Sequence, residues 1–205
     1  MKTKVSTMKT KARITLLGLV MVITLCYVNF ASADSDFAIG SPATASVDLD
    51  FQIVIPNFIY FRVGTAVPGT VDVINFNPTA TDVATPAAVT AGTGGDAGPG
   101  AVNVDVISNG GNITITEANN SGGNGLYDGT ANYISYAQIN TGSPVIPAPA
   151  LSDAGGTTST ILSAGVTNLS DVWTYTYTNP ATPPVAGTYG TAANGGRVTY
   201  TAAIP

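Results

Sequence analysis

The strongest constraint on the fold is a strict alternation of residue types near the end of the chain. The run VWTYTYT over 172–178 alternates large rings with threonine, and the run GRVTYTA over 196–202 repeats the pattern. A period of two places one residue kind on each face of a β-strand, and aromatic and β-branched residues favour strands. We therefore predict two antiparallel strands that face one core. The predicted core aromatics are Trp173, Tyr175, Tyr177 and Tyr200. The same stripe is also compatible with a sugar-binding platform, although such rings are more often core.

Residues 1–33 have the three regions of a secretory signal peptide. Five basic residues and no acid precede an apolar run over 14–26, and the small residues Ala31-Ser32-Ala33 follow it. The run is short for a bilayer, which needs about 20 residues. Leu25 before Cys26 does not fit a lipobox, which has a small residue there. We expect an exported protein without a membrane anchor.

Cleavage is predicted between Ala33 and Asp34. Mass spectrometry of the exported protein should therefore find Asp34 at the N-terminus. A mature chain that retains Cys26, with or without a lipid, would contradict the prediction.

Removal of the signal would leave a strongly acidic chain. All twelve acidic residues follow residue 33, but only two basic ones do, Arg62 and Arg197. Such a charge repels nucleic acids and anionic lipids, so we expect neither as a partner. No Cys would remain, so stability must come from a core rather than from disulfides. About 170 residues are enough for one sandwich domain.

Residues 34–46 form a short N-terminal extension that contains Gly40 and Pro42. Phe37 and Ile39 would share a face if the extension were a strand. Two interpretations stay open: a mobile tail, or a donor strand in which Phe37 and Ile39 contact a neighbouring subunit.

Residues 47–205 are predicted to form a single β-sandwich domain. Its first part, 47–63, is the most apolar stretch and is interrupted by Pro56, which predicts two strands or one strand with a bulge. A further strand is expected over 69–76, and a hairpin over 101–116 with its turn at 108–112. Residues 79–100 are expected to be mainly loop, with at most one short strand around Val83. We also predict strands over 133–139 and 157–163, and an extended linker around Pro144, Pro147 and Pro149.

The fold class that these expectations indicate is all-β: an antiparallel, immunoglobulin-like β-sandwich of about eight or nine strands. No helical periodicity is present outside the signal.

The residue types after the signal exclude most catalytic chemistry. Nucleophilic catalysis usually needs a His beside the nucleophile, and there is no His, Lys or Cys after residue 33. We predict no catalytic, cofactor-binding or metal site. Calcium is the one metal that the oxygen donors of this chain would suit. Asp48 with Asp50, or the loop 122–128, would supply them. That loop is one residue longer than a calcium-binding nonapeptide repeat and occurs once, so we expect no ion there.

The two ends of the mature chain resemble bacterial fimbrial subunits. Ala45-Ser46-Val47-Asp48 before an apolar strand is similar to their start, and Ala186-Gly187-Thr188-Tyr189-Gly190 with the run RVTYT over 197–201 is similar to their end. This is a resemblance to chaperone–usher pilins, including those without disulfides. It implies an incomplete immunoglobulin-like sandwich that a neighbour's N-terminal strand completes, and a periplasmic chaperone as partner.

Two functions are therefore expected. The first is a non-enzymatic structural or adhesive protein of the cell surface, a pilus or filament subunit that forms a homopolymer or joins neighbouring surface subunits by strand addition. The second is a secreted, monomeric β-sandwich module that binds carbohydrate or protein. The first function requires assembly into polymers, whereas the second is that of a monomer.

Overall fold

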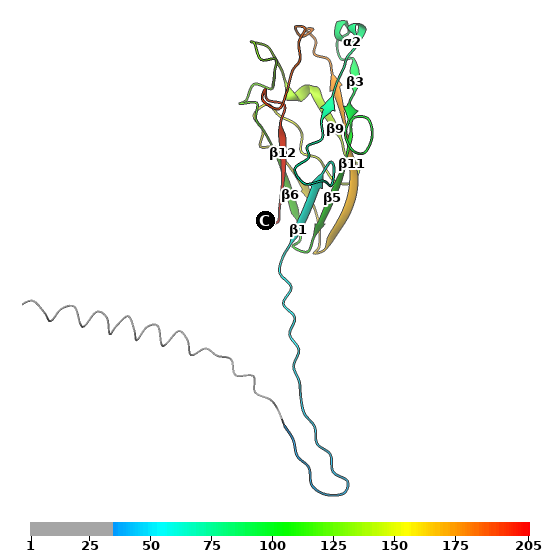
Figure 1. The fold of residues 1–205 in the computed structure, drawn as a ribbon, viewed down its shortest axis with the longest axis vertical. Helices are drawn as coiled ribbons and strands as arrows, with labels where there is room; N and C mark the ends of the chain where they lie inside the picture. The colour runs from blue at the N-terminus through cyan, green and yellow to red at the C-terminus, as the bar shows by residue number, and fades with distance from the viewer. Residues whose placement is uncertain (1–34) are drawn as a thin grey trace, which may run out of the picture. The chain divides into compact units, whose positions relative to one another are not determined.

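The structure is a computed structural model that describes residues 35–205. The predicted signal peptide and the bond between Ala33 and Asp34 lie outside the described residues. The chain divides into two units between Val54 and Ile55. All described strands lie in residues 55–205, which we call the two-sheet body (Figure 1). The described residues contain no helix with the length and hydrophobicity to cross a bilayer.

The larger sheet of the body has five strands, and every pairing in it is antiparallel. Its order is β1–β5–β11–β3, and β9 also pairs with β11. These strands are β1 (Ile59–Val63), β3 (Val89–Ala91), β5 (Ala101–Ser108), β9 (Ile139–Gly142) and β11 (Thr167–Thr178).

The smaller sheet has three antiparallel strands in the order β10–β6–β12. They are β6 (Ile113–Asn119), β10 (Thr158–Ile161) and β12 (Val198–Ala203). Two short ladders lie outside both sheets: β2 (Ile74–Asn75) with β4 (Thr93–Gly94), and β7 (Leu126–Tyr127) with β8 (Tyr133–Ile134). Within residues 35–205 the helical elements are α2 (Ala80–Ala84) and the 3-10 turn η1 (Tyr136–Gln138).

One core lies between the two larger sheets. The large sheet contributes alternate residues of β5 and β11, and the small sheet contributes alternate residues of β6 and β10. The fully or nearly buried members are Val102, Val104, Val106, Ile113, Ile115, Ile146, Ile161, Trp173 and Tyr175. The prediction of an all-β, antiparallel fold is confirmed.

The predicted hairpin over 101–116 is wrong in its pairing, although both strands exist. β5 pairs with β1 and β11, whereas β6 pairs with β10 and β12. The turn therefore carries the chain from one sheet to the other. The physical reason is that each strand has one mainly apolar, buried face, and the two faces meet when the strands lie on opposite sides of one core. A Cβ at Gly110 would lie 2.5 Å from the Ile204 side chain, so this turn packs closely against Ile204.

Three further expectations are corrected. The loop expected over 79–100 contains α2, which begins at a capping box: the Thr79 side chain accepts the Asp82 N–H, and the Asp82 carboxylate accepts the Thr79 N–H. The same stretch contains β3 and β4. The strand expected over 69–76 is reduced to β2. Residues 47–55, expected as a strand of the sandwich, pair with no strand among the described residues.

Strand β1 is fixed to the sheet by one of the two arginines that follow the signal. Arg62 lies opposite Asp105 of β5 and donates from Nε and Nη2 to its carboxylate, and from Nη1 to the Gly64 carbonyl. Ser170 of β11 donates to the other carboxylate oxygen at 2.7 Å. The hydrogen bonds from Ser170 and Arg62 lower the pKa of Asp105. Three adjacent strands are thereby held in register.

Candidate functional site

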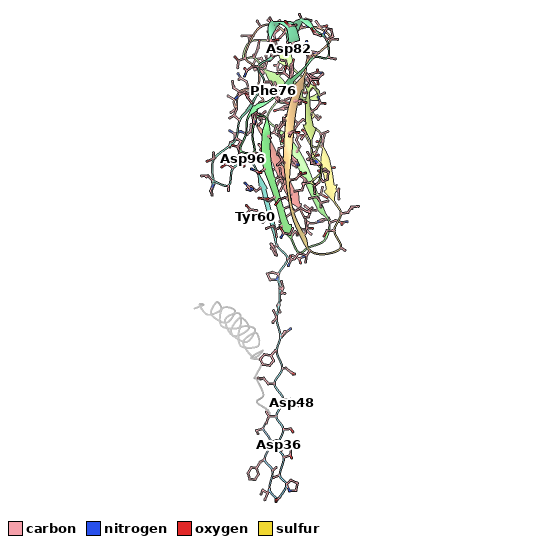
Figure 2. All side chains as sticks on the ribbon, turned by 90° about the vertical axis from the view of Figure 1, so that its right-hand side faces the viewer. Asp36, Asp48, Tyr60, Phe76, Asp82 and Asp96 are labelled. Carbon is pink, nitrogen blue, oxygen red and sulfur yellow. The ribbon has the colours of Figure 1, made fainter. Side chains whose placement is uncertain are left out.

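The most unusual feature of the described residues is an apolar segment whose side chains are exposed. Residues 47–55, here called the apolar segment, place five large apolar side chains at alternate positions. Their exposed fractions run from 58% at Val47 to 87% at Phe51. The segment is drawn as an extended trace in Figure 1, and Asp48 marks it in Figure 2. A soluble chain rarely exposes so many neighbouring apolar side chains unless they meet a partner.

The apolar face of this segment has the same parity as the buried face of β1. The odd-numbered residues are apolar in the segment, namely Val47, Leu49, Phe51, Ile53 and Ile55. In β1 the odd-numbered residues Ile59, Phe61 and Val63 pack against the core. The even positions of the segment carry Asp48, Asp50 and Gln52 as well as Val54. This pattern is typical of a strand with one face in a core and one face in water.

Asn109 binds the residues of the body that directly precede β1. Asn109 accepts the Phe58 N–H at 2.8 Å and donates from Nδ2 to the Pro56 carbonyl at 2.9 Å. Its own N–H donates to the Phe58 carbonyl. Phe58 therefore continues the pairing of β1 with β5 by one residue.

One side of the body is closed by the chain that links β9 and β10. Residues 143–151 lie there, and Ile146 is fully buried. Asp171 of β11 accepts two successive N–H groups of this link, and Trp173 Nε1 donates to the Ile146 carbonyl at 2.8 Å. On the small sheet, Ser159 of β10 donates to another carbonyl of the link. The link thus connects both sheets and covers the core between them.

On the opposite side, which we call the open side, the strands β1 and β12 lie next to each other (Figure 1). Each of these strands pairs along one edge only within the described part of the chain. Their inward side chains are only partly buried, whereas the corresponding residues of β5 and β6 are fully buried. The partly buried ones are Ile59, Phe61, Val63, Tyr200 and Ala202.

The predicted aromatic residues lie in this core. Trp173 is fully buried, and Tyr175 and Tyr177 are nearly so. Tyr200 is half-buried on β12, with its ring 5.1 Å from that of Trp173 at 70°. The Tyr175 and Tyr200 hydroxyls lie 3.2 Å apart, and burial raises the pKa of both phenols. Because the Trp173 ring is enclosed, the stripe does not form an exposed sugar platform.

Phe37 and Ile39, the predicted donor-strand residues, are both exposed, at 82% and 87%. The extension that carries them forms no strand. The Asp36 carboxylate accepts the Ser46 N–H at 2.9 Å, which closes residues 36–46 into a loop.

Sequence reasoning missed one buried carboxylate. Glu117 is fully buried on β6 and accepts hydrogen bonds from Asn119 Nδ2 at 2.8 Å and Thr157 Oγ1 at 3.4 Å. The sequence does indicate this position, because Glu117 is an odd-numbered residue like Ile113 and Ile115 and therefore lies on the inward face of β6.

The two candidate calcium sites have different surroundings. Asp48 and Asp50 are exposed on the apolar segment. Asp128 accepts five hydrogen bonds from its own loop: from the N–H groups of Thr130, Ala131 and Asn132, from the Thr130 hydroxyl and from Asn132 Nδ2. Within residues 35–205, no group of three His, Cys, Asp or Glu side chains is arranged to hold a metal ion.

The Asp128 loop predicts an acid-sensitive contribution to stability. Hydrogen bonding from Asn132 and Thr130 holds the pKa of Asp128 well below its ordinary value. The ionised Asp128 carboxylate therefore contributes fully to the free energy of unfolding above roughly pH 4, and this contribution is lost progressively as the pH falls further. The difference in melting temperature between wild type and Asp128→Ala should be largest near neutral pH and shrink below pH 4. Asp50→Ala, at an exposed site, is the control; a wild-type advantage that grows in acid would contradict the assignment.

No protein-family model and no curated protein matches this chain.

Proposed function

We propose that this protein is an exported, non-enzymatic structural or adhesive protein of the cell surface that polymerises by β-strand addition. The observation that carries the proposal is the apolar segment, residues 47–55. It has the residue pattern of a half-buried strand, but its side chains lie in solvent. Strand addition removes both costs of such a segment, because it buries the side chains and satisfies the backbone.

The edges of the two-sheet body also support assembly. Natural sheets commonly protect their edges with lysine, and the chain has no lysine after residue 33. β12 instead carries Thr199, Thr201 and Ala203 at its exposed positions. These small residues leave room for another strand to approach.

The resemblance to chaperone–usher pilins favours the same function. It implies export, a fimbrial location and a periplasmic chaperone that shields the subunit before assembly. A chaperone of this kind would need to cover the apolar segment, because its large apolar side chains are exposed.

A second candidate is a secreted, monomeric module that binds carbohydrate or protein. It is favoured by a different feature, the stacked rings of Tyr127 and Tyr133 on the β7–β8 ladder. Their centroids lie 4.8 Å apart at 22°, and Tyr133 is 48% exposed. Exposed aromatic rings of this kind are used to bind sugars and proteins.

Assembly separates the two candidates. Exported and purified protein should give species larger than a monomer in size-exclusion chromatography, with a distribution that depends on concentration, and filaments in negative-stain microscopy. A sharp monomer at every concentration would overturn the polymer proposal and leave the monomeric binding module.

A further inference from the structure

We propose that Asn124 is a site of spontaneous covalent modification, at which the peptide nitrogen of Gly125 attacks the side-chain amide and a carboxylate replaces it. The site lies in the loop that leads into β7, and the inference does not depend on whether the protein assembles. The chain itself supplies both reacting groups, and water is the co-reactant.

The reaction balances without an oxidant or a reductant. The Gly125 nitrogen loses its proton to water and attacks Cγ of Asn124. A new C–N bond forms, and the side-chain nitrogen leaves as ammonia. Water then opens the resulting five-membered imide at one of its two carbonyls. The products are aspartate, which keeps the original main chain, and isoaspartate, in which the main chain runs through Cγ and is one carbon longer.

The sequence offers this chemistry at three places. Glycine after asparagine favours the attack, because no Cβ shields the peptide nitrogen. The three Asn-Gly pairs begin at Asn109, Asn124 and Asn194. All three lack a bulky residue after the asparagine, so an unfolded chain should modify them at similar rates. The fold is therefore what distinguishes them.

The pair at Asn124 is placed so that it can react. Asn124 is exposed, and among the described residues no hydrogen bond involves its side chain or the Gly125 N–H. A Cβ at Gly122 or Gly123 would meet no atom within 4 Å, so the residues before Asn124 have space to turn. Gly125 is buried. Rotation about the Asn124 main chain can therefore bring Cγ to the Gly125 nitrogen while the packed glycine keeps its place.

The pair at Asn109 is held at both reacting groups. The Asn109 side chain accepts the Phe58 N–H at 2.8 Å and donates to the Pro56 carbonyl at 2.9 Å. The Gly110 N–H, which would be the attacking group, donates to Ser108 Oγ at 3.2 Å. These hydrogen bonds must break before the imide can form.

The pair at Asn194 is held through its main chain. The Asn194 N–H donates to the Thr191 carbonyl at 2.8 Å, and the Asn194 carbonyl accepts the Tyr127 N–H at 3.0 Å. The Gly195 carbonyl accepts the Tyr136 hydroxyl. Rotation is therefore restrained on both sides of the reacting bond, and this pair also needs local opening before it reacts.

Isoaspartate at position 124 would disturb the start of β7. A Cβ at Gly125 would lie 2.4 Å from the Ile134 carbonyl oxygen, and a Cβ at Gly195 would lie 2.7 Å from the Gly125 carbonyl oxygen. Gly125 thus has little room to shift when the main chain before it becomes longer. The β7–β8 ladder has only two residue pairs and carries the stacked rings of Tyr127 and Tyr133. We expect isoaspartate to open this ladder.

The first test follows the three pairs in the full exported chain during incubation at mildly alkaline pH. Peptide mapping by mass spectrometry should show conversion at Asn124 about tenfold or more faster than at Asn109 or Asn194, because those two must first break hydrogen bonds. In urea the three rates should converge. Asn124→Gln, which would need a six-membered ring, should remain unmodified.

Two results of this test would overturn the proposal. One is conversion of Asn109 or Asn194 in the folded protein as fast as that of Asn124. The other is an Asn124 that converts only in urea, because the folded loop would then prevent the attack.

The second test isolates the effect on the ladder. Anion exchange separates the chains that have gained a carboxylate, and enzymatic methylation of isoaspartate measures how many have the longer main chain. Hydrogen–deuterium exchange of β7 and β8 should be faster in this fraction than in Asn124→Asp, which has the same charge and the original main chain. Equal exchange in the two samples would contradict the opening of the ladder.

Discussion

Trp173→Ala is expected to destabilise the protein by about 3–5 kcal/mol, the usual cost of removing a large aromatic side chain from a core. Trp173 is fully buried, packs edge-on against Tyr200 and donates from Nε1 to the Ile146 carbonyl. The substitution would therefore leave a cavity and an unsatisfied buried carbonyl. Chemical denaturation should show a large fall in the unfolding midpoint, and the melting temperature should drop by about 6–20 °C.

Val172→Ala is the matched control for this prediction. Val172 precedes Trp173 on β11 but lies on the opposite face, where it is 37% exposed. We expect a loss of about 1 kcal/mol or less. Equal losses from the two substitutions would contradict the position of Trp173 at the centre of the core.

Ile146→Ala is expected to have the second largest effect, a loss of about 2–5 kcal/mol. Ile146 is fully buried although it lies in a link without regular secondary structure. Asp171 binds its N–H at 2.7 Å, and Trp173 binds its carbonyl, so the backbone cannot move inward to fill the cavity that the substitution leaves. The free energy of unfolding, measured by urea denaturation, checks the prediction.

The preceding residue provides the control for the link. Val145 is 55% exposed, and its N–H donates to the same Asp171 carboxylate. Val145→Ala keeps that hydrogen bond and should change the stability by less than about 0.5 kcal/mol. If Ile146→Ala were equally mild, the link would not be the cover of the core that its burial indicates.

The strands that form the centre of the fold were predictable because their pattern and their propensity agree. The alternation around Trp173 and Tyr200 predicts β11 and β12, and alternating valines and isoleucines predict β5 and β6. Period-two alternation identifies the buried face of a strand, but it contains no information about which strand is its neighbour. The hairpin prediction failed for this reason, since β5 and β6 face each other across the core rather than pairing.

Two features of the candidate site depend on long-range contacts that a local pattern does not show. The prolines around Ile146 predict an extended link, but its burial requires Asp171, which lies 25 residues away along the chain. The segment 47–55 has the pattern of a core strand, and the sequence alone assigns it to its own sandwich. Its side chains are exposed instead, and the hydrogen bonds of Asn109 to Pro56 and Phe58 begin just after it.

Hydrogen–deuterium exchange of the assembled protein tests the central claim most directly. The Phe51→Asp variant serves as the monomeric reference. The account predicts that backbone amides of residues 47–55 and of β12 become protected together on assembly, since a ladder forms between them. Amides of the extension 34–46 should exchange at the same rate in both states. Fast exchange of residues 47–55 in assembled protein, at the rate seen in the monomer, would contradict strand insertion.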